Sequence, residues 1–386
     1  MELYIHIPYC RQKCRYCDFA SYPGQESTMA AYVDALLREA DAMASTAQGR
    51  TIQTVFIGGG TPSILPAPLL RKLLSGLRER FDIPSGIEFT SEANPGTLTP
   101  EWLEAALEGG VNRLSMGMQA YQPELLSALG RIHTHADVEH SVHLARQMGI
   151  DNLSVDLMFG LPGQTPEMWQ ETLHAALALQ VEHMSCYGLI PEEGTPLMRD
   201  LEAGRLSLPE EEDERRMYDD TLNLLAKHGY QQYEISNFAK PGRECRHNIG
   251  YWTRVPYIGL GAAASSLLPT AGGGLRLTNP AGIHDYIAMA DAQAWRRRDR
   301  VSLMPSDARF ESLMLGLRMT RGVSEEAFAQ MHGLSLDAYC GDILRQQAQQ
   351  GLLTHRNGFW PSPGGAWMCR TPSSWKFWKQ WNKQTD

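Results

Sequence analysis

The sequence predicts an α/β fold, an incomplete (βα)6 TIM-like barrel with a smaller, mainly helical C-terminal domain. Six apolar runs rich in β-branched residues recur along the first half of the chain, and segments with a helical pattern separate them. Strands that alternate with helices in this way form right-handed βαβ units and a parallel sheet. The chain has 386 residues, more than the roughly 250–300 residues at which one hydrophobic core stops growing, so we expect a second domain.

The helix starts support this assignment of the first half. Thr99-Pro100 and Thr165-Pro166 each place a capping hydroxyl before a proline in the first helical turn, and they predict helices over 101–107 and 167–179. In barrels of this kind ligands bind at the carboxyl ends of the strands, so the residues there are candidates for a functional site. The strands are expected at residues 3–7, 54–57, 87–90, 113–118, 153–158 and 183–189.

The pattern after the sixth strand is less regular. Proline and glycine residues between 190 and 210 indicate a loop out of the repeat, and a helix is expected over 210–228. Residues 229–300 are mixed, and helical patterns return at 308–319, 324–331 and 336–350. We therefore predict a partial barrel at 1–200, a barrel extension at 201–300, a helical, winged-helix-like domain at 301–360 and an atypical Trp- and Lys-rich tail at 361–386.

The composition is that of an ordinary globular protein, with 43% apolar and 20% charged residues. The net charge of −9 argues against nucleic-acid binding. No apolar run reaches the roughly 20 residues of a transmembrane span, and no basic segment is followed by the apolar run of a secretory signal. Seven cysteines, an odd number, favour a reducing compartment and thiols kept for metal, so we predict a cytoplasmic protein. The basic run Arg296-Arg297-Arg298 is expected to be a solvated surface turn.

Three cysteines, Cys10, Cys14 and Cys17, lie on the short loop after the first predicted strand. Soft thiolates clustered on one loop hold an iron–sulfur cluster or zinc. A cubane cluster held by three thiolates leaves one iron open for a second molecule. Zinc would need a fourth ligand, which His6 could supply, and buried thiols without any metal are a third interpretation.

Polar residues stand at the ends of the next strands. The second strand ends in Gly58-Gly59-Gly60-Thr61, and glycines let the backbone approach a ligand closely. Taken singly, each of the others is as well explained by a structural hydrogen bond or a surface position. On successive strand ends they could together bind a zwitterionic amino acid and a ribose. These residues are Glu92, Gln119 and Asp156, with Arg131 after a short helix.

The cysteine spacing resembles that of the radical S-adenosylmethionine (SAM) superfamily. The surrounding motifs are similar to one branch of it, the oxygen-independent coproporphyrinogen III dehydrogenases and the related haem chaperones. These motifs span residues 4–8, 58–63, 92–97, 112–119, 129–133 and 156–165, and the resemblance runs from about residue 3 to residue 350. It implies a radical SAM barrel in which Cys10, Cys14 and Cys17 hold a [4Fe–4S] cluster and SAM chelates the open iron. By motif, the residues lining the cofactor would be Tyr4, Gly59, Gly60, Thr61, Glu92, Gln119, Arg131 and Asp156, with Tyr187 and Leu189 near the adenine.

Two features favour the haem chaperones over the dehydrogenases. Cys10 lies almost at the start of the chain, and Phe19 stands where the dehydrogenases carry a further cysteine. Residues 245–252 also resemble the His-Asn-x-x-Tyr-Trp signature of the chaperones. The resemblance implies haem as bound cargo and apo-haemoproteins as partners, with respiratory enzymes at the membrane as candidates. His247, Tyr251 and Cys245 are the candidate axial ligands, although a histidine beside aromatic residues is also typical of a core.

The chain departs from the family in two places. No histidine follows the glycine-rich turn at 259–266, where the family often has one, and the resemblance is expected to end near Leu353. Trp375, Trp378 and Trp381 in the tail suit an interfacial helix, a locally packed or disordered tail, or a shifted reading frame. The leading hypothesis is a haem chaperone. The alternatives are a coproporphyrinogen III dehydrogenase acting in porphyrin synthesis and a zinc-stabilised binding module.

Overall fold

The computed structural model describes residues 1–270 and 273–361. Its described strands form a 12-stranded sheet in the order β12-β11-β10-β9-β1-β2-β3-β4-β5-β6-β8-β7, with a separate 2-stranded sheet, β13-β14. The first six strands pair in parallel, each with the next along the chain. They are β1 (Glu2–Ile7), β2 (Thr54–Gly59), β3 (Glu88–Ala93), β4 (Arg113–Gln119), β5 (Asn152–Phe159) and β6 (His183–Gly188).

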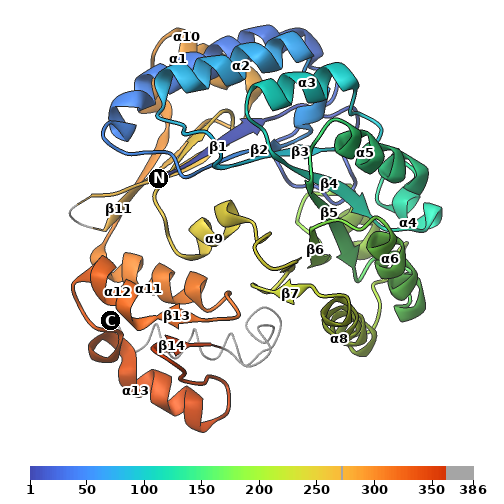
Figure 1. The fold of residues 1–386 in the computed structure, drawn as a ribbon, viewed down its shortest axis with the longest axis vertical. Helices are drawn as coiled ribbons and strands as arrows, with labels where there is room; N and C mark the ends of the chain where they lie inside the picture. The colour runs from blue at the N-terminus through green and yellow to red at the C-terminus, as the bar shows by residue number, and fades with distance from the viewer. Residues whose placement is uncertain (271–272, 362–386) are drawn as a thin grey trace.

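The predicted incomplete α/β barrel is thus confirmed, and each of the six expected strands is present. The helices between them cover the outer face of the sheet (Figure 1). The hydroxyls of Thr99 and Thr165 accept hydrogen bonds from the backbone N–H groups of Trp102 and Met168, as the capping pattern predicted. The helices are α1 (Met29–Ala47), α2 (Ala67–Arg80), α3 (Pro100–Glu108), α4 (Pro123–Ala128), α5 (His135–Gln147) and α6 (Pro166–Ala178).

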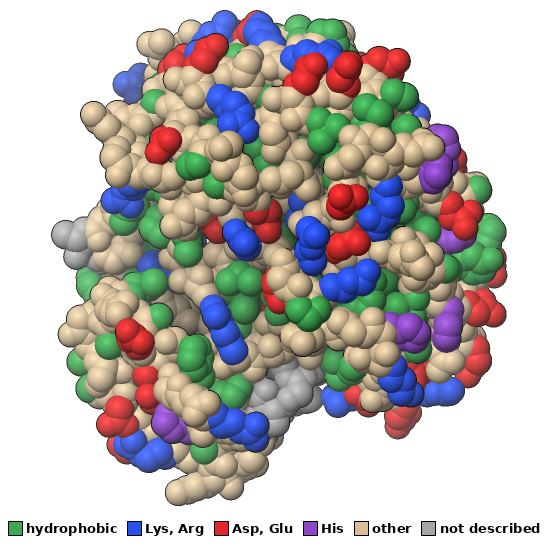
Figure 2. Space-filling view, in the orientation of Figure 1, with side chains coloured by type: hydrophobic (Ala, Val, Ile, Leu, Met, Phe, Trp, Pro, Cys, Tyr) green, Lys and Arg blue, Asp and Glu red, His purple; other side chains and the backbone are tan. Residues whose placement is uncertain are grey.

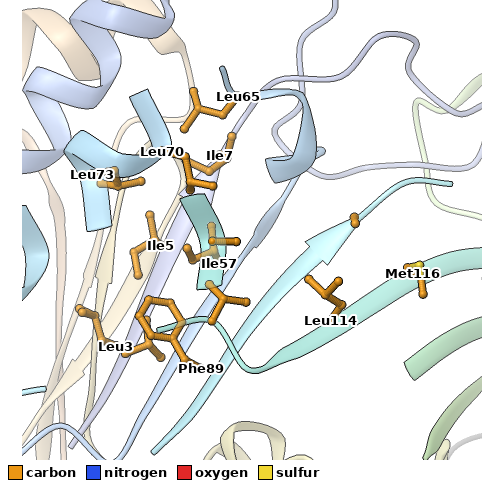
Figure 3. Close-up of a cluster of buried hydrophobic side chains, with 14 of the residues drawn as sticks. Leu3, Ile5, Ile7, Ile57, Leu65, Leu70, Leu73, Phe89, Leu114 and Met116 are labelled. Carbon is orange, nitrogen blue, oxygen red and sulfur yellow. The ribbon is translucent and has the colours of Figure 1, made fainter. Parts of the chain in front are cut away.

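Alternation along the strands separates the core from the site. Leu3, Ile5 and Ile7 point from β1 towards the helices, where they are fully buried (Figure 3). Their partners on α2 include Leu70 and Leu73. Each such side chain contributes about 1.5–3 kcal/mol by leaving water. Because successive side chains of a strand point to opposite faces, the intervening residues face the barrel interior.

The sheet continues on both sides of the six-stranded unit. Beyond β6, β8 (Asn237–Ala239) and β7 (Gln231–Gln232) pair antiparallel. On the other side, β9 (Tyr257–Leu260) pairs parallel with β1, and β10 (Ser265–Leu268), β11 (Gly274–Thr278) and β12 (Asp299–Leu303) follow antiparallel. The helices of this region are α7 (Pro196–Glu202), α8 (Glu211–Lys227), α9 (Arg246–Trp252) and α10 (Ile283–Asp291). The sequence predicted α8 but treated the α7 region as a loop.

The C-terminal helices lie where the sequence placed them. They are α11 (Pro305–Gly316), α12 (Glu325–His332) and α13 (Leu336–Gln349), joined by the short pair β13 (Val323–Ser324) and β14 (Phe359–Trp360). They enclose a hydrophobic cluster of their own that includes Leu313, Phe328 and Leu344. The predicted tail lies outside the described residues, apart from residue 361.

The surface charges and the helices of the described part are those of an ordinary globular protein. Acidic and basic side chains are interspersed on the face shown in Figure 2. Among the helices of residues 1–270 and 273–361, none has both the length and the apolar composition of a membrane span.

The basic run differs from the prediction at one residue. Arg296 and Arg297 are exposed, as expected, but Arg298 is buried. Its Nη2 donates to Glu39 Oε1 at 2.6 Å, and its Nε donates to Asn279 Oδ1 at 2.8 Å. Glu39 also accepts hydrogen bonds from the Tyr286 hydroxyl at 2.6 Å and from the backbone N–H of Gly261 at 2.8 Å. This buried network joins α1 to α10 and to the turn after β9.

We expect the substitution Arg298→Ala to lower the free energy of unfolding by about 3–5 kcal/mol, because it leaves Glu39 buried without its cation. Equilibrium denaturation in urea measures this change. Arg297→Ala, at the neighbouring exposed arginine, is the matched control and should stay within about 0.5 kcal/mol. Equal stability of the two variants would contradict the role assigned to the network.

Candidate functional site

A cavity of about 350 Å³ opens at the carboxyl ends of the barrel strands. It brings together side chains from the loop after β1, the ends of β2 to β6 and the turn after α4. Eleven of the thirteen residues proposed for the cluster and its cofactor line it: Cys10, Cys14, Cys17, Gly59, Gly60, Thr61, Glu92, Gln119, Arg131, Asp156 and Tyr187.

The three cysteines are free thiols on one wall of this cavity. The Thr61 hydroxyl donates to Cys10 Sγ at 3.4 Å, and Arg131 Nη1 donates to Cys14 Sγ at 3.5 Å. Cys17 Sγ lies 4.0 Å from the Ser21 hydroxyl. Burial raises the pKa of the Cys10 and Cys17 thiols.

The donor set fits a cluster better than a single metal ion. In the part of the chain that the structure describes, no three His, Cys, Asp or Glu side chains converge as ligands of one ion. His6, the fourth ligand that zinc would need, has both ring nitrogens engaged. Its Nδ1 lies 3.0 Å from the Tyr4 hydroxyl, and its Nε2 lies 2.8 Å from the carbonyl oxygen of Ala20. Three thiols on one wall of a cavity suit a polynuclear group with one position left open.

Two carboxyl groups face the same cavity from neighbouring parts of the sheet. Glu92 Oε2 accepts a hydrogen bond from the backbone N–H of Gly59 at 3.1 Å. Burial and then the nearby Asp156 raise the pKa of Glu92 to about 7. Asp156 accepts a hydrogen bond from the Ser115 hydroxyl at 3.2 Å, and burial raises its pKa too. Two carboxyl groups that are costly to ionise together favour a cationic ligand between them.

The glycines at the end of β2 make close packing possible. Gly59 has a φ of +111°, and a Cβ there would lie 2.5 Å from the His6 ring. A Cβ on Gly60 would lie 2.6 Å from the carbonyl oxygen of Tyr9. The backbone N–H of Gly60 donates to the carbonyl of Ile7 at 2.8 Å. These glycines therefore let β2 pack directly against the start of the cysteine loop.

Gln119 reaches the cavity through an irregularity of β4. Its φ is +66°, and the pairing of β4 with β5 shifts register between Gly117 and Gln119. A non-glycine residue in this conformation costs about 1–3 kcal/mol, so the surrounding structure must hold it. The bulge places Gln119 in the cavity wall beside Arg131.

Two predicted cofactor residues lie outside this cavity. Leu189 is buried in a hydrophobic cluster with Met158, Leu161 and Leu197, because β6 ends at Gly188 and its alternation ends there. Tyr4 lines a second cavity of about 190 Å³, deeper in the barrel. The two cavities share Glu92, Ser115, Asp156 and Tyr187.

The three haem-ligand candidates lie on or next to α9, which borders this second cavity. His247 and Tyr251 line it, whereas Cys245 lines neither cavity. The His247 ring is 1% exposed, with Nδ1 2.8 Å from the Thr54 hydroxyl and Nε2 3.1 Å from the Tyr251 hydroxyl. Burial lowers its pKa to about 3. The structure therefore places His247 as a neutral core residue without a free ring nitrogen.

Cys245 is fully buried before the first turn of α9. Its thiol donates to Glu88 Oε1 at 3.5 Å, and burial raises its pKa to about 12. Glu88 also accepts the backbone N–H groups of Arg246 at 2.8 Å and His247 at 3.0 Å, so it caps the helix.

Several residues of the cavity walls were not among the predicted site residues, and Asn94 and Arg113 are two of them. Asn94 follows Glu92 by two positions and begins an Asn-Pro-Gly turn, a signal that could have identified it. Arg113 is buried at the start of β4, where only the three-dimensional packing shows that it faces the interior.

Two known protein families match parts of the chain. Residues 4–176 match the radical SAM superfamily, and residues 303–367 match the HemN C-terminal domain. The second match passes Leu353, where we expected the resemblance to end. The chain is 41% identical over 352 residues to "Heme chaperone HemW" of Bacillus subtilis, covering 91% of this chain and 92% of that protein. It is 36% identical over 366 residues to "Heme chaperone HemW" of Escherichia coli, covering 93% of each.

A solved structure shows the same fold. Coproporphyrinogen III oxidase (HemN) of Escherichia coli superposes with a TM-score of 0.80 over 94% of this chain and 86% of that chain. The sequence identity is 23%, so this likeness concerns the fold alone.

We expect His247→Ala to lower the free energy of unfolding by about 2–4 kcal/mol at neutral pH, because Thr54 and Tyr251 lose a buried partner. The folded ring titrates near pH 3, and an unfolded histidine titrates near pH 6.5. The wild type therefore loses this contribution as the pH falls from about 6.5 towards 3, by up to about 1.4 kcal/mol per pH unit. The difference between wild type and variant should shrink accordingly in urea denaturation.

The control is the exposed histidine His174 on α6, whose substitution by Ala should change stability by less than about 0.5 kcal/mol. A difference between wild type and His247→Ala that does not depend on pH would show that the ring is not held neutral in the core.

Proposed function

Because the chain belongs to the HemW family of the radical SAM superfamily, we propose that it is a haem chaperone. It binds haem and delivers it to apo-haemoproteins while carrying a [4Fe–4S] cluster and SAM. The observation that carries the proposal is the 41% identity to a protein named haem chaperone over 91% of this chain. We place this activity in the cytoplasm, where a reducing environment keeps thiols available for metal binding.

Cys10, Cys14 and Cys17 would hold the cluster. When bound, the cluster supplies an electron and an iron with an open coordination position. The thiolates bring negative charge into a partly buried wall, and the Arg131 guanidinium next to Cys14 Sγ compensates part of it.

The other walls suit the parts of SAM. Glu92 would pair with the ammonium group, and Arg131 would bind the carboxylate. Gln119 and Asp156 would bond the ribose hydroxyls, and Tyr187 would pack near the adenine. We assign supporting roles to the two residues outside the cavity: Tyr4 orients His6 below it, and Leu189 packs behind the wall.

The candidate haem site has little free volume, and its candidate ligands are already hydrogen-bonded. The second cavity, at about 190 Å³, is smaller than the roughly 300–1,000 Å³ of typical small-molecule sites. We keep Tyr251 and His247 as candidate ligands because they line it, and we set Cys245 aside because its thiol bonds to Glu88. Ligation by His247 would require its hydrogen bond to Tyr251 to break.

We expect the anaerobically reconstituted protein to contain about four iron and four sulfide per chain. It should bind haem with a new Soret band and transfer it to an apo-haemoprotein, with respiratory enzymes as candidates. It should not convert coproporphyrinogen III to protoporphyrinogen. Absorbance spectroscopy, metal analysis and chromatographic product analysis measure these outcomes.

Each alternative has its own signature in this experiment. Conversion of coproporphyrinogen III, with 5′-deoxyadenosine formed, would establish the dehydrogenase instead. One zinc per chain without iron would indicate the zinc-stabilised module. A protein with a full cluster that leaves the haem spectrum unchanged would contradict the chaperone proposal.

We expect the affinity for SAM to fall as the pH drops below about 7, because the pKa of Glu92 is about 7 and only its ionised form pairs with an ammonium group. The loss should reach up to about tenfold per pH unit. Glu92→Gln should weaken binding by about 10–100-fold at pH 8 and remove most of the pH dependence. Calorimetric titration of the reconstituted protein measures the affinity, and an unchanged pH profile in Glu92→Gln would contradict the assignment.

A further inference from the structure

A continuous hydrogen-bonded path joins two of the three cluster cysteines. Thr61 Oγ1 donates to Cys10 Sγ at 3.4 Å and accepts from Asn94 Nδ2 at 2.9 Å. Asn94 Oδ1 accepts from Arg131 Nη2 at 3.1 Å, and Arg131 Nη1 donates to Cys14 Sγ at 3.5 Å. Three side chains from the turns after β2, β3 and α4 therefore connect two thiols that lie four positions apart in the sequence.

We propose that Asn94 is a positioning residue for the cluster. Through Thr61 and Arg131 it aims one hydrogen-bond donor at Cys10 and one at Cys14, and thereby sets the reduction potential of the bound cluster. This inference rests on the proposed function in one respect, since it requires that the three cysteines hold an iron–sulfur cluster.

The direction of each hydrogen bond follows from the groups at the far end of the path. The Met118 carbonyl can only accept, so His133 Nε2 donates to it at 3.1 Å. The Nδ1 of the neutral ring then accepts from Arg131 Nε at 3.4 Å. Arg131 has only donors, so it must face the amide oxygen of Asn94. The amide nitrogen then faces Thr61, whose hydroxyl accepts this bond and keeps its single proton for Cys10 Sγ.

The backbone of Asn94 is fixed as firmly as its side chain. Residues 94–97 form a turn in which Thr97 N–H donates to the Asn94 carbonyl at 3.1 Å and Gly96 has a φ of +75°. The Asn94 N–H donates to the Ser63 hydroxyl at 3.2 Å. The turn therefore fixes the backbone from which the Asn94 amide reaches Thr61 and Arg131.

Arg131 is fixed from the opposite side. Its Nη2 donates to the Gly117 carbonyl at 2.6 Å, and a Cβ on Gly117 would lie 2.9 Å from this nitrogen. Glycine at this position leaves room for the guanidinium to reach the backbone of β4. Among the described residues no carboxylate lies within ion-pair distance of Arg131, so no protein carboxylate offsets the charge that it directs at Cys14.

The physical consequence is electrostatic. A reduced cluster carries one more negative charge than the oxidised one, so donors aimed at its sulfur ligands stabilise the reduced form and raise the reduction potential. Cys17 takes no part in this path, since its neighbours are the Ser21 hydroxyl at 4.0 Å and the backbone N–H of Phe19. The path therefore acts on Cys10 and Cys14 and not on the third cysteine.

The test is the midpoint potential of the reconstituted cluster, followed by EPR during a redox titration. Thr61→Val removes the donor to Cys10 at nearly constant volume, and we expect a shift to a more negative potential. Asn94→Leu should shift it in the same direction without adding a charge. The double variant should shift by less than the sum of the two, because both act through one path. Thr61→Ser keeps the hydroxyl and should restore the wild-type value.

Thr90→Val is the matched control, since Thr90 is also fully buried but its hydroxyl has no hydrogen-bond partner in the described part of the chain. It should leave the potential unchanged. Equal potentials in wild type and Thr61→Val, with full iron content in both, would overturn the inference. Loss of iron in Thr61→Val but not in Thr61→Ser, with unchanged circular dichroism, would support it. A wild-type protein that holds no iron would instead reject the proposed cluster, and this inference with it.

Discussion

The alternation of side chains along β1 to β6 is the constraint on which the rest of the structure depends. It sends Leu3, Ile5 and Ile7 towards the helices, where their burial supplies the driving force for the barrel. The alternate residues of the same strands face the barrel interior, and many of them are polar. Much of the site is therefore formed by the same strands that build the core.

A polar interior is stable only if its groups find partners. Here the partners come from distant parts of the chain: Glu88 of β3 caps α9, and Thr54 of β2 bonds the His247 ring. Two of the carboxyl groups, those of Glu92 and Asp156, line both cavities. Glu92 and Asp156 raise each other's cost of ionisation there, a property that suits a cationic ligand.

The sequence predicted the parts of the molecule that follow from local patterns. All six strands, the caps at Thr99 and Thr165 and the grouping of the strand-end residues needed only periodicity and motif. The errors arise where tertiary packing decides. Arg298 is buried because Glu39 lies on a helix 259 positions away in the sequence. Leu189 lies outside the cavity because β6 ends one residue before it. The described strands beyond residue 230 contain only two to five residues each, too few for a clear pattern.

Helix α9 has one further consequence. Its inner side carries His247 and Tyr251 at the second cavity, and its end faces the C-terminal helices. The Arg318 guanidinium stacks 4.3 Å above the Trp252 ring, and Arg254 pairs with Glu311 of α11 at 3.1 Å. Helix α9 is thus buried partly by the barrel and partly by the C-terminal helices. The two should unfold together in a single cooperative transition, although each has its own hydrophobic cluster.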